Sequence, residues 1–465
     1  MCSRWNNIIR SWPSHFLSQL RFGNEDSTLF LRNISHRRGN SIRHSLERSP
    51  LSTLNLDYDL IRPSAQNFKG DEQEIAVLLQ YLERVCFLHL RLSFSTWRSI
   101  AAATSFMPIS CTCIESINLD TGNRTTGFVL PDLFLKGQAP RLHTLIMIGV
   151  FPPSLSSLLL SPTRLTWLIL DGIPDASYLP PRELLMHLGN TPKLQYLSIG
   201  FLSATRHRHL AGDVNQISSP NHVALPCLKK FHFRGVCTYL ESLVTNLDTA
   251  SVYELVFTFF YQPRYTILHL STFLRRTKRF GFDGIRIGLW PNGVVITATP
   301  AVSPIPEEVL CFRIPCDHLD FQVASALQIC RALGPNFGNM EDLFVRYSQD
   351  QLPTQWHKEV HPALWRELLS QFRGMKTLWI SSALISEITN AMGYDTLQLF
   401  EDLPILAWVV VEIHGDDPST TAADSLSDLL TRVRSLGGPV VDVYRLFSDK
   451  WKMGKLPEEA RVSGD

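Results

Sequence analysis

One short phrase recurs through the middle of the chain and constrains its fold more than any other feature. An apolar residue, two variable residues, a second apolar residue, one variable residue and a third apolar residue follow one another. The phrase begins at Leu142, Leu165, Leu194, Leu228 and Val252, so that successive starts lie 23, 29, 34 and 24 residues apart. A phrase of this kind at this period is typical of a leucine-rich repeat, which contributes one strand and one helix or turn per repeat.

The alternation within the phrase indicates which side chains are buried. On an extended segment the fourth and sixth residues point the same way, and the fifth points to the opposite face. One repeat cannot bury its apolar side alone, so repeats must stack on one another. The sequence therefore predicts an α/β leucine-rich-repeat solenoid (horseshoe) with parallel strands on the concave face and helices on the convex face.

The same phrase extends in both directions from the central repeats. Further strand-like matches begin at Leu51, Val85, Ile114, Thr277, Val309, Met340, Met375 and Leu406. Stripes of helical periodicity lie between the phrases, at 75–82, 183–188, 240–247, 267–274, 323–333, 364–372 and 426–436. Residues 285–299 predict an additional hairpin, because Pro291-Asn292-Gly293 suits a tight turn.

The chain divides into four predicted parts. Residues 1–22 contain a helical stripe and a first strand, 23–50 form a basic linker or loop, 51–449 form the solenoid, and 450–465 form a polar tail. An Arg-rich, acid-poor start is also found in transit peptides and in RNA-binding arms. Three aromatic residues among the first sixteen favour a structural segment followed by a solvated linker.

The composition limits the kinds of molecule that the chain is expected to bind. The formal net charge is +1, so the molecule as a whole has no attraction to nucleic acid or anionic membrane. No run approaches the roughly 18 apolar residues of a membrane span. Nine cysteines without a Cys-x-x-Cys pair predict reduced thiols and no metal site. We expect a soluble cytoplasmic or nuclear protein, in which the His-containing stretch 206–209 lies on a solvated loop.

No motif of known catalytic chemistry is present. The chain has no Gly-x-x-x-x-Gly-Lys-Ser/Thr, Gly-x-Gly-x-x-Gly, Gly-x-Ser-x-Gly or His-Glu-x-x-His sequence. The adjacent acids Asp416-Asp417 and Glu341-Asp342 face apart on a strand and fit surface charge better than a catalytic pair. We therefore predict a protein that is not an enzyme, with no catalytic residues, no cofactor and no metal.

The third, fifth and seventh places of each phrase are expected to line the concave face. Aromatic and Arg side chains at these places suit a protein partner, because such residues dominate binding hot spots. Some of these aromatics are alternatively covered by loops or by the chain termini. The predicted partner-binding residues of the concave face are Trp167, Tyr196, Lys230, His232, Arg234, Arg279, Phe344, Arg346 and Trp379.

Several repeats are similar to those of F-box and leucine-rich-repeat proteins of mushroom-forming fungi. The matching stretches are Ala139 to Leu145, Leu165 to Ile173 with Tyr178 to Leu184, Leu194 to Phe201, and Leu228 to Val236 with Tyr239 to Leu243. The F-box of that family is a three-helix module that docks on the adaptor subunit of cullin–RING ubiquitin ligases. Cys2 to Ile9 resembles only its last helix, and the Leu-Pro opening of the module is missing.

The resemblance implies a substrate-recognition subunit of an SCF-type ligase. Its partners would be a substrate protein of unknown identity and, through Cys2, Trp5, Ile8 and Ile9, the cullin–RING adaptor subunit. The alternative is a leucine-rich-repeat scaffold or binding protein without a ubiquitin role, because the F-box is incomplete. A third interpretation, from another class, is an enzyme with its active site on an inserted loop.

Overall fold

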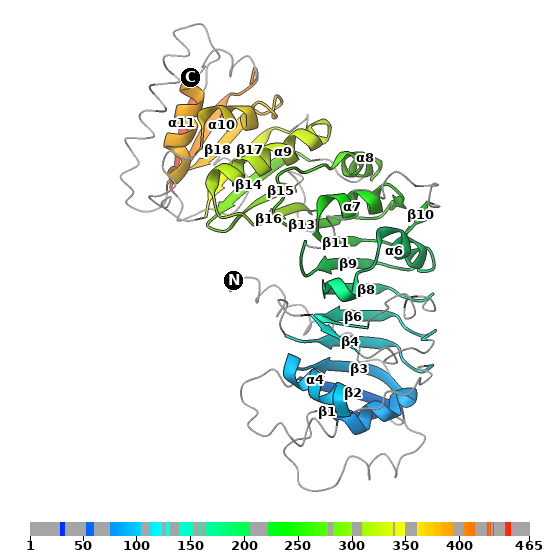
Figure 1. Cartoon of the computed structure of the whole chain (residues 1–465). Helices are drawn as coiled ribbons and strands as arrows, with labels where there is room; N and C mark the ends of the chain where they lie inside the picture. The colour runs from blue at the N-terminus through cyan, green and yellow to red at the C-terminus, as the bar shows by residue number, and fades with distance from the viewer. Residues whose placement is uncertain are drawn as a thin grey trace.

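The computed structural model shows an α/β protein built on one large, mostly parallel sheet (Figure 1). This confirms the predicted α/β class. The described residues are 28–32, 53–59, 75–103, 112–122, 127–130, 139–152, 159, 163–204, 222–277, 282–299, 309–337, 340–348, 360–394, 403–413, 426, 428, 431 and 442–447. The predicted N-terminal segment 1–22 and the tail 450–465 lie outside these ranges.

Sixteen strands form the large sheet within the described part of the chain. They are β1 (Thr28–Arg32), β2 (Thr53–Asp59), β3 (Val85–Arg91), β4 (Ser116–Asp120), β6 (Thr144–Ile148), β8 (Trp167–Ile173), β9 (Tyr196–Phe201), β11 (Lys230–Gly235), β13 (Glu254–Phe259), β14 (Gly284–Trp290), β15 (Gly293–Thr299), β16 (Val309–Ile314), β17 (Asp342–Tyr347), β18 (Thr377–Ser381), β19 (Trp408–Ile413) and β20 (Asp442–Phe447). Neighbouring strands follow chain order except around the β14–β15 hairpin, where the order is β13-β16-β15-β14-β17.

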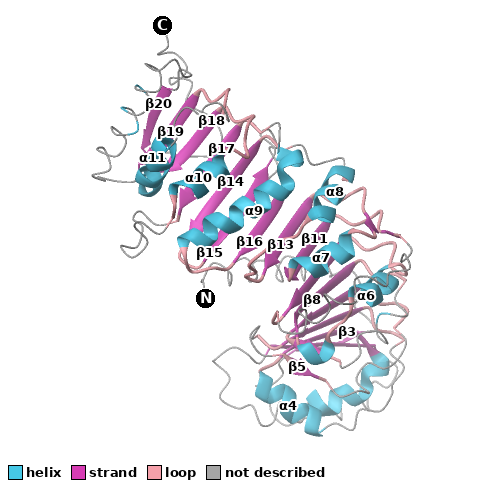
Figure 2. Cartoon of the chain, turned by 45° about the horizontal axis from the view of Figure 1, so that its top comes forward, coloured by secondary structure: helices cyan, strands magenta, loops and turns pink. Residues whose placement is uncertain are grey.

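Helices lie in sequence order along one face of this sheet (Figure 2). They are α4 (Phe94–Ala103), α6 (Pro181–Leu188), α7 (Cys237–Val244), α8 (Leu268–Arg276), α9 (Leu319–Phe337), α10 (Pro362–Leu369) and α11 (Ile385–Tyr394), with the short helices η2 (Leu79–Arg84), η3 (Asp175–Ser177) and η6 (Ser382–Leu384). Each helix from α6 to α10 contacts the next one along the chain. Two small parallel pairs complete the described elements, β5 (Phe128–Val129) with β7 (Val150–Phe151) and β10 (Val223–Ala224) with β12 (Leu247–Asp248).

Two strands of the large sheet were not predicted, β1 and β20. Strand β1 lies within the segment 23–50 that we expected to be a linker or loop. Its sequence Thr-Leu-Phe-Leu-Arg is short and precedes a Ser- and Arg-rich stretch, which concealed it, yet Leu29 and Leu31 align with Leu54 and Leu56 of β2. Strand β20 extends the other end of the sheet by pairing in parallel with β19. These two strands therefore depend on pairing with an adjacent strand, because their own sequences show little of the repeat pattern.

The predicted hairpin over 285–299 is confirmed. Strands β14 and β15 pair antiparallel from Gly284 with Thr299 to Trp290 with Gly293, and β15 also pairs antiparallel with β16. The strand expected to begin at Thr277 is wrong, because Thr277 follows the last residue of α8. The phrase that enters the sheet is Phe282-x-x-Ile285-x-Ile287, five residues later, with all three apolar side chains buried.

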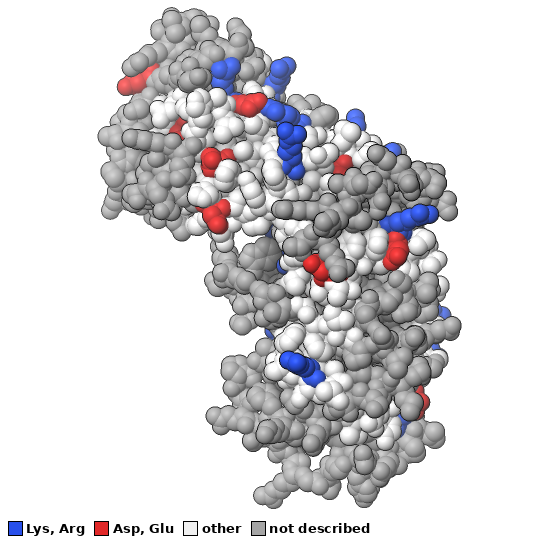
Figure 3. Space-filling view, viewed as in Figure 1, with Lys and Arg blue, Asp and Glu red and all other residues white. Residues whose placement is uncertain are grey.

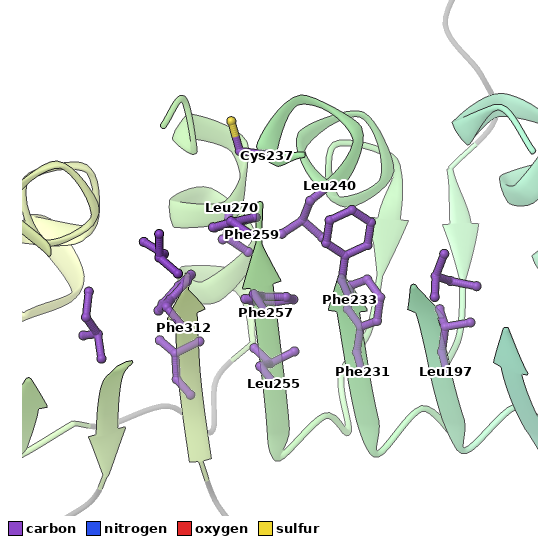
Figure 4. Close-up of a cluster of buried hydrophobic side chains, with 14 of the residues drawn as sticks. Leu197, Phe231, Phe233, Cys237, Leu240, Leu255, Phe257, Phe259, Leu270 and Phe312 are labelled. Carbon is purple, nitrogen blue, oxygen red and sulfur yellow. The ribbon is translucent and has the colours of Figure 1, made fainter. Parts of the chain in front are cut away.

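The core lies between the sheet and the helices (Figure 4). Phe233, Phe257 and Phe312 occupy aligned places on β11, β13 and β16. The Phe257 ring centroid lies 5.7 Å from that of Phe231 and 5.6 Å from that of Phe312. Leu240 of α7 and Leu270 of α8 lie above these strands. The inward side chains of neighbouring strands thus form one continuous apolar layer, as the alternation within the phrase requires.

A buried carboxylate joins consecutive helices. Glu241 of α7 accepts hydrogen bonds from the backbone N–H groups of His269 (2.7 Å) and Leu270 (2.8 Å) in the first turn of α8. Burial raises the pKa of Glu241, and these hydrogen bonds oppose that rise. The first turn of a helix carries unpaired N–H groups and positive partial charge, so Glu241 fixes the start of α8 against α7.

Across the described ranges we find no helix with the length and apolar character that crossing a bilayer requires.

Candidate protein-binding face

The sheet face opposite helices α6 to α11, called the outward face below, carries three aligned rows of side chains. From β3 to β13 the first row is Phe87, Ser116, Thr144, Trp167, Tyr196, Lys230 and Glu254, the middle row is His89, Asn118, Ile146, Ile169, Ser198, His232 and Val256, and the third row is Arg91, Asp120, Ile148, Asp171, Gly200, Arg234 and Thr258. These are the residues expected at the third, fifth and seventh places of the phrases. That they bind a partner stays a prediction.

The three rows continue beyond the hairpin. One of the arginines found there is not the arginine that the sequence predicted. Arg279 lies outside the described residues. Arg286 of β14 occupies the middle row, aligned with Phe344 of β17 and through it with Trp379 of β18. Arg346 continues the third row next to Gly288. Sequence reasoning missed Arg286 because it assigned residues 285–299 to an additional hairpin and expected the repeat strand to begin at Thr277.

A hydrogen-bonded chain of side chains occupies the centre of the outward face. The Trp167 and Tyr196 rings stack with centroids 4.8 Å apart. The Tyr196 hydroxyl lies 2.7 Å from His232 Nδ1, and His232 Nε2 lies 2.8 Å from Glu254 Oε1. In the neutral ring, Nε2–H donates to the carboxylate and Nδ1 accepts from the tyrosine. Lys230 Nζ lies 2.6 Å from the other Glu254 oxygen.

The charge of Glu254 is stabilised by this chain. Burial acts to raise the pKa of Glu254, but the hydrogen bonds from His232 and Lys230 outweigh it and hold the pKa below its usual value. Four consecutive strands therefore present a preorganised group of aromatic and charged side chains. Such preorganisation reduces the entropy that a partner must overcome on binding.

An ion pair crosses the sheet at Gly200. Arg234 Nη2 of β11 lies 3.0 Å from Asp171 Oδ1 of β8, although β9 runs between these strands. The residue between them in the third row is Gly200, where an added Cβ would lie 2.3 Å from Asp171 Oδ1. The absence of a side chain at Gly200 is therefore what allows the pair to form.

Acidic and basic side chains also pair on the N-terminal strands. His89 Nδ1 lies 2.9 Å from Asp57 Oδ1, and Arg91 lies 3.5 Å from Asp59 and 3.3 Å from Asp120. Asp57 and Asp59 were not among the predicted site residues. The alternation along β2 could have identified them, because Asp57 and Asp59 lie on the face opposite the buried Leu54 and Leu56.

An apolar patch separates these charged groups. Ile146 and Ile148 of β6 are half-buried, and Ile169 of β8 is 9% exposed beside Trp167. The patch lies between Asp120 and Asp171 in the third row and is continuous with the Trp167 ring. Apolar surface bounded by charged residues is the usual composition of a protein interface.

Two predicted contact residues offer little surface to a partner. Tyr196 is only 2% exposed, because its ring lies between Trp167 and His232, with centroids 4.8 and 5.1 Å away. Trp379 is 7% exposed and stacks on Phe344 with centroids 5.2 Å apart. These two residues support their neighbours, whereas Trp167 and Phe344 keep partly exposed rings.

The C-terminal end of the outward face has its own group. The Arg286 guanidinium lies 5.5 Å from the Phe344 ring centroid, at cation–π distance. Burial raises the pKa of Asp342 in the first row, while hydrogen bonds from the Thr377 and Trp379 side chains act against that rise. Phe344 is thus held between a stacked tryptophan and an arginine.

Cysteine and histidine do not gather into ligand groups in the described ranges. Cys86, Cys113, Cys227, Cys237, Cys311, Cys316 and Cys330 are free thiols there. Within the same ranges, no three His, Cys, Asp or Glu side chains are close enough together to hold a metal ion. Cys2, Cys111 and residues 206–209 lie outside the described residues, as do Trp5, Ile8 and Ile9.

A comparison with models of known protein families finds no match to this chain, and a comparison with curated proteins finds none either.

Proposed function

We propose that the chain is a protein-interaction module and a substrate-recognition subunit of an SCF-type cullin–RING ubiquitin ligase. The observation that carries its protein-binding part is the set of continuous rows on the outward face, where Trp167, Phe344 and the arginines take hot-spot positions. The ubiquitin part rests on the sequence resemblance of residues 2–9 to the last F-box helix.

The fold part of the proposal is a leucine-rich-repeat solenoid of horseshoe form, with the outward face as its concave side. Support comes from the strands, which follow chain order through β13 and recur with the phrase, and from the helices on one face only (Figure 1). Stacked units of this kind offer long surfaces for partners.

In this function the chain performs no chemistry of its own. It would hold a substrate protein so that one of its lysines lies near the loaded conjugating enzyme, and proximity would supply the rate gain. The second candidate keeps the binding face but has no ubiquitin role. It is favoured by the rows of the outward face, which support protein binding without any contribution from residues 2–9.

A direct pull-down with the purified cullin adaptor separates these two functions. We expect the full chain to bind the adaptor and the variant Trp5→Asp/Ile8→Asp to lose binding while its circular dichroism is unchanged. If the unmodified, folded chain does not bind the adaptor, the ubiquitin role is refuted and the scaffold function stands.

A second experiment tests the binding face itself. Ile148→Glu introduces a charge into the half-buried apolar patch, whereas Met186→Glu introduces the same charge on α6, where Met186 is 58% exposed. We expect proteins that co-purify with the unmodified chain and with Met186→Glu to be lost with Ile148→Glu. Equal retention by both variants would exclude the outward face as the binding surface.

A further inference from the structure

Between β2 and β18 the outward face has two parts of opposite formal charge. From β2 to β8 its described charged residues are Asp57, Asp59, Asp120 and Asp171 against Arg91. From β9 to β18 they are Lys230, Arg234, Arg286, Arg313 and Arg346 against Glu254 and Asp342. The whole chain has a net charge of only +1, so this separation belongs to the face and not to the composition.

Three arginines of the basic half surround the hairpin. The register aligns Arg313 of β16 with Val295 of β15, then with Gly288 of β14 and Arg346 of β17. Arg286 occupies the neighbouring row between Thr297 and Phe344. Three steps of about 4.8 Å place the backbones of Arg313 and Arg346 roughly 14 Å apart.

Small residues separate these arginines. Gly288 has no side chain, and Val295 and Thr297 are short. The Trp290 indole of β14 lies over Gly288, with Nε1 3.2 Å from the place of an added Cβ. All three arginines are half-buried. On the side of the molecule in Figure 3, by contrast, described acidic and basic side chains are intermixed.

The chemistry of these groups selects carboxylates. A guanidinium presents a planar fork that binds a carboxylate with two parallel hydrogen bonds. Roughly 14 Å is the length of about four extended residues at 3.3 Å each, so acidic residues at alternate positions of a segment would point toward the arginines. Phe344, held by Arg286 at 5.5 Å and by Trp379, adds an apolar contact.

We propose that strands β14 to β17 of the outward face bind an extended acidic segment of a partner protein, through Arg286, Arg313, Arg346 and the Phe344 ring. The inference rests on the protein-binding role proposed above and names the chemistry of the partner. A long nucleic acid fits less well, because its phosphates would meet Asp171 and Asp120 as it crossed toward the N-terminal strands.

The probe is a fluorescein-labelled 12-residue peptide of alternating Glu and Leu, measured by fluorescence anisotropy with the full chain. We expect saturable binding that weakens as salt is raised. The variant Arg286→Gln/Arg313→Gln/Arg346→Gln should weaken binding at least tenfold, and each single change severalfold. The control Arg264→Gln/Arg275→Gln/Arg276→Gln removes the same charge from exposed positions in and before α8 and should bind as the unmodified chain does.

Three outcomes would overturn the proposal. They are equal binding by the two triple variants, equal binding of a peptide with Gln in place of Glu, and tighter binding of a 12-nucleotide oligouridylate than of the acidic peptide. If the triple variant fails to fold by circular dichroism, the single variants decide. A negative peptide result with retained adaptor binding refutes this inference and leaves the proposed ubiquitin function intact.

Discussion

The substitution Phe257→Ala measures how much the continuous apolar layer stabilises the fold. Phe257 is fully buried between Phe231 and Phe312, with centroids 5.7 and 5.6 Å away. Removing a buried phenylalanine costs roughly 3–5 kcal/mol, because apolar burial is lost and a cavity remains. The loss of two aromatic contacts places this site near the upper end of that range. We expect about 5 kcal/mol, a large fraction of a typical domain stability of roughly 5–15 kcal/mol.

Urea unfolding followed by circular dichroism measures this free energy, and Val256→Ala is the matched control. Val256 precedes Phe257 on β13 but faces outward and is half-buried, so its truncation should cost less than about 1 kcal/mol. Hydrogen exchange should quicken first in β11, β13 and β16, because stacked units are stabilised by their neighbours. Equal losses from the two substitutions would refute the assignment of Phe257 to the inner and Val256 to the outer face.

Three further outcomes are expected. Leu168→Asp places a charge at a fully buried site and should lower the free energy of unfolding in urea by several kcal/mol. Ile169→Asp on the outward face should lower it much less. Equal losses from the two substitutions would mean that the register is wrong. Gly200→Ala should lower the free energy of unfolding by about 1–3 kcal/mol, because the new methyl group displaces Asp171 from Arg234. In the Asp171→Ala background the same change should have little effect. An equal loss in both backgrounds would rule out this ion pair as the cause. Burial lowers the pKa of His187 below its usual 6.5, so the unfolded chain takes up the proton first and stability present above pH 6.5 is lost as pH falls. His187→Leu should flatten that part of the pH profile of the urea midpoint, and an unchanged slope would contradict the assignment.

The alternation of apolar residues was sufficient to assign side chains to the two faces. Leu168 is fully buried and Ile169 lies in the outward row, as the fourth and fifth places of the phrase require. Alternation reports only the face on which a side chain lies. It could not show that Tyr196 is covered, because that depends on Trp167 and His232 from neighbouring strands.

At the hairpin the repeat pattern alone does not determine which residues form the strand. Two phrases, starting at Thr277 and at Phe282, overlap there, and they differ locally only in that Phe282 is apolar at the first place and Thr277 is not. The choice is made by the pairing of Gly284 with both Thr299 and Asp342, which are distant in sequence. Arg286 entered the site for the same reason. The short strand β1 likewise depends on its pairing with β2.

The exchanged order β13-β16-β15-β14 also has a consequence for folding during synthesis. Each earlier strand of the large sheet is followed along the chain by the strand that covers its edge, but the edge of β13 is paired by β16, which begins at Val309. Roughly fifty residues must therefore leave the ribosome after β13 before its hydrogen-bonding groups are satisfied. At about 5–20 residues per second, this open edge persists for roughly 3–10 seconds. The emerging chain is most exposed to wrong strand pairing during that interval.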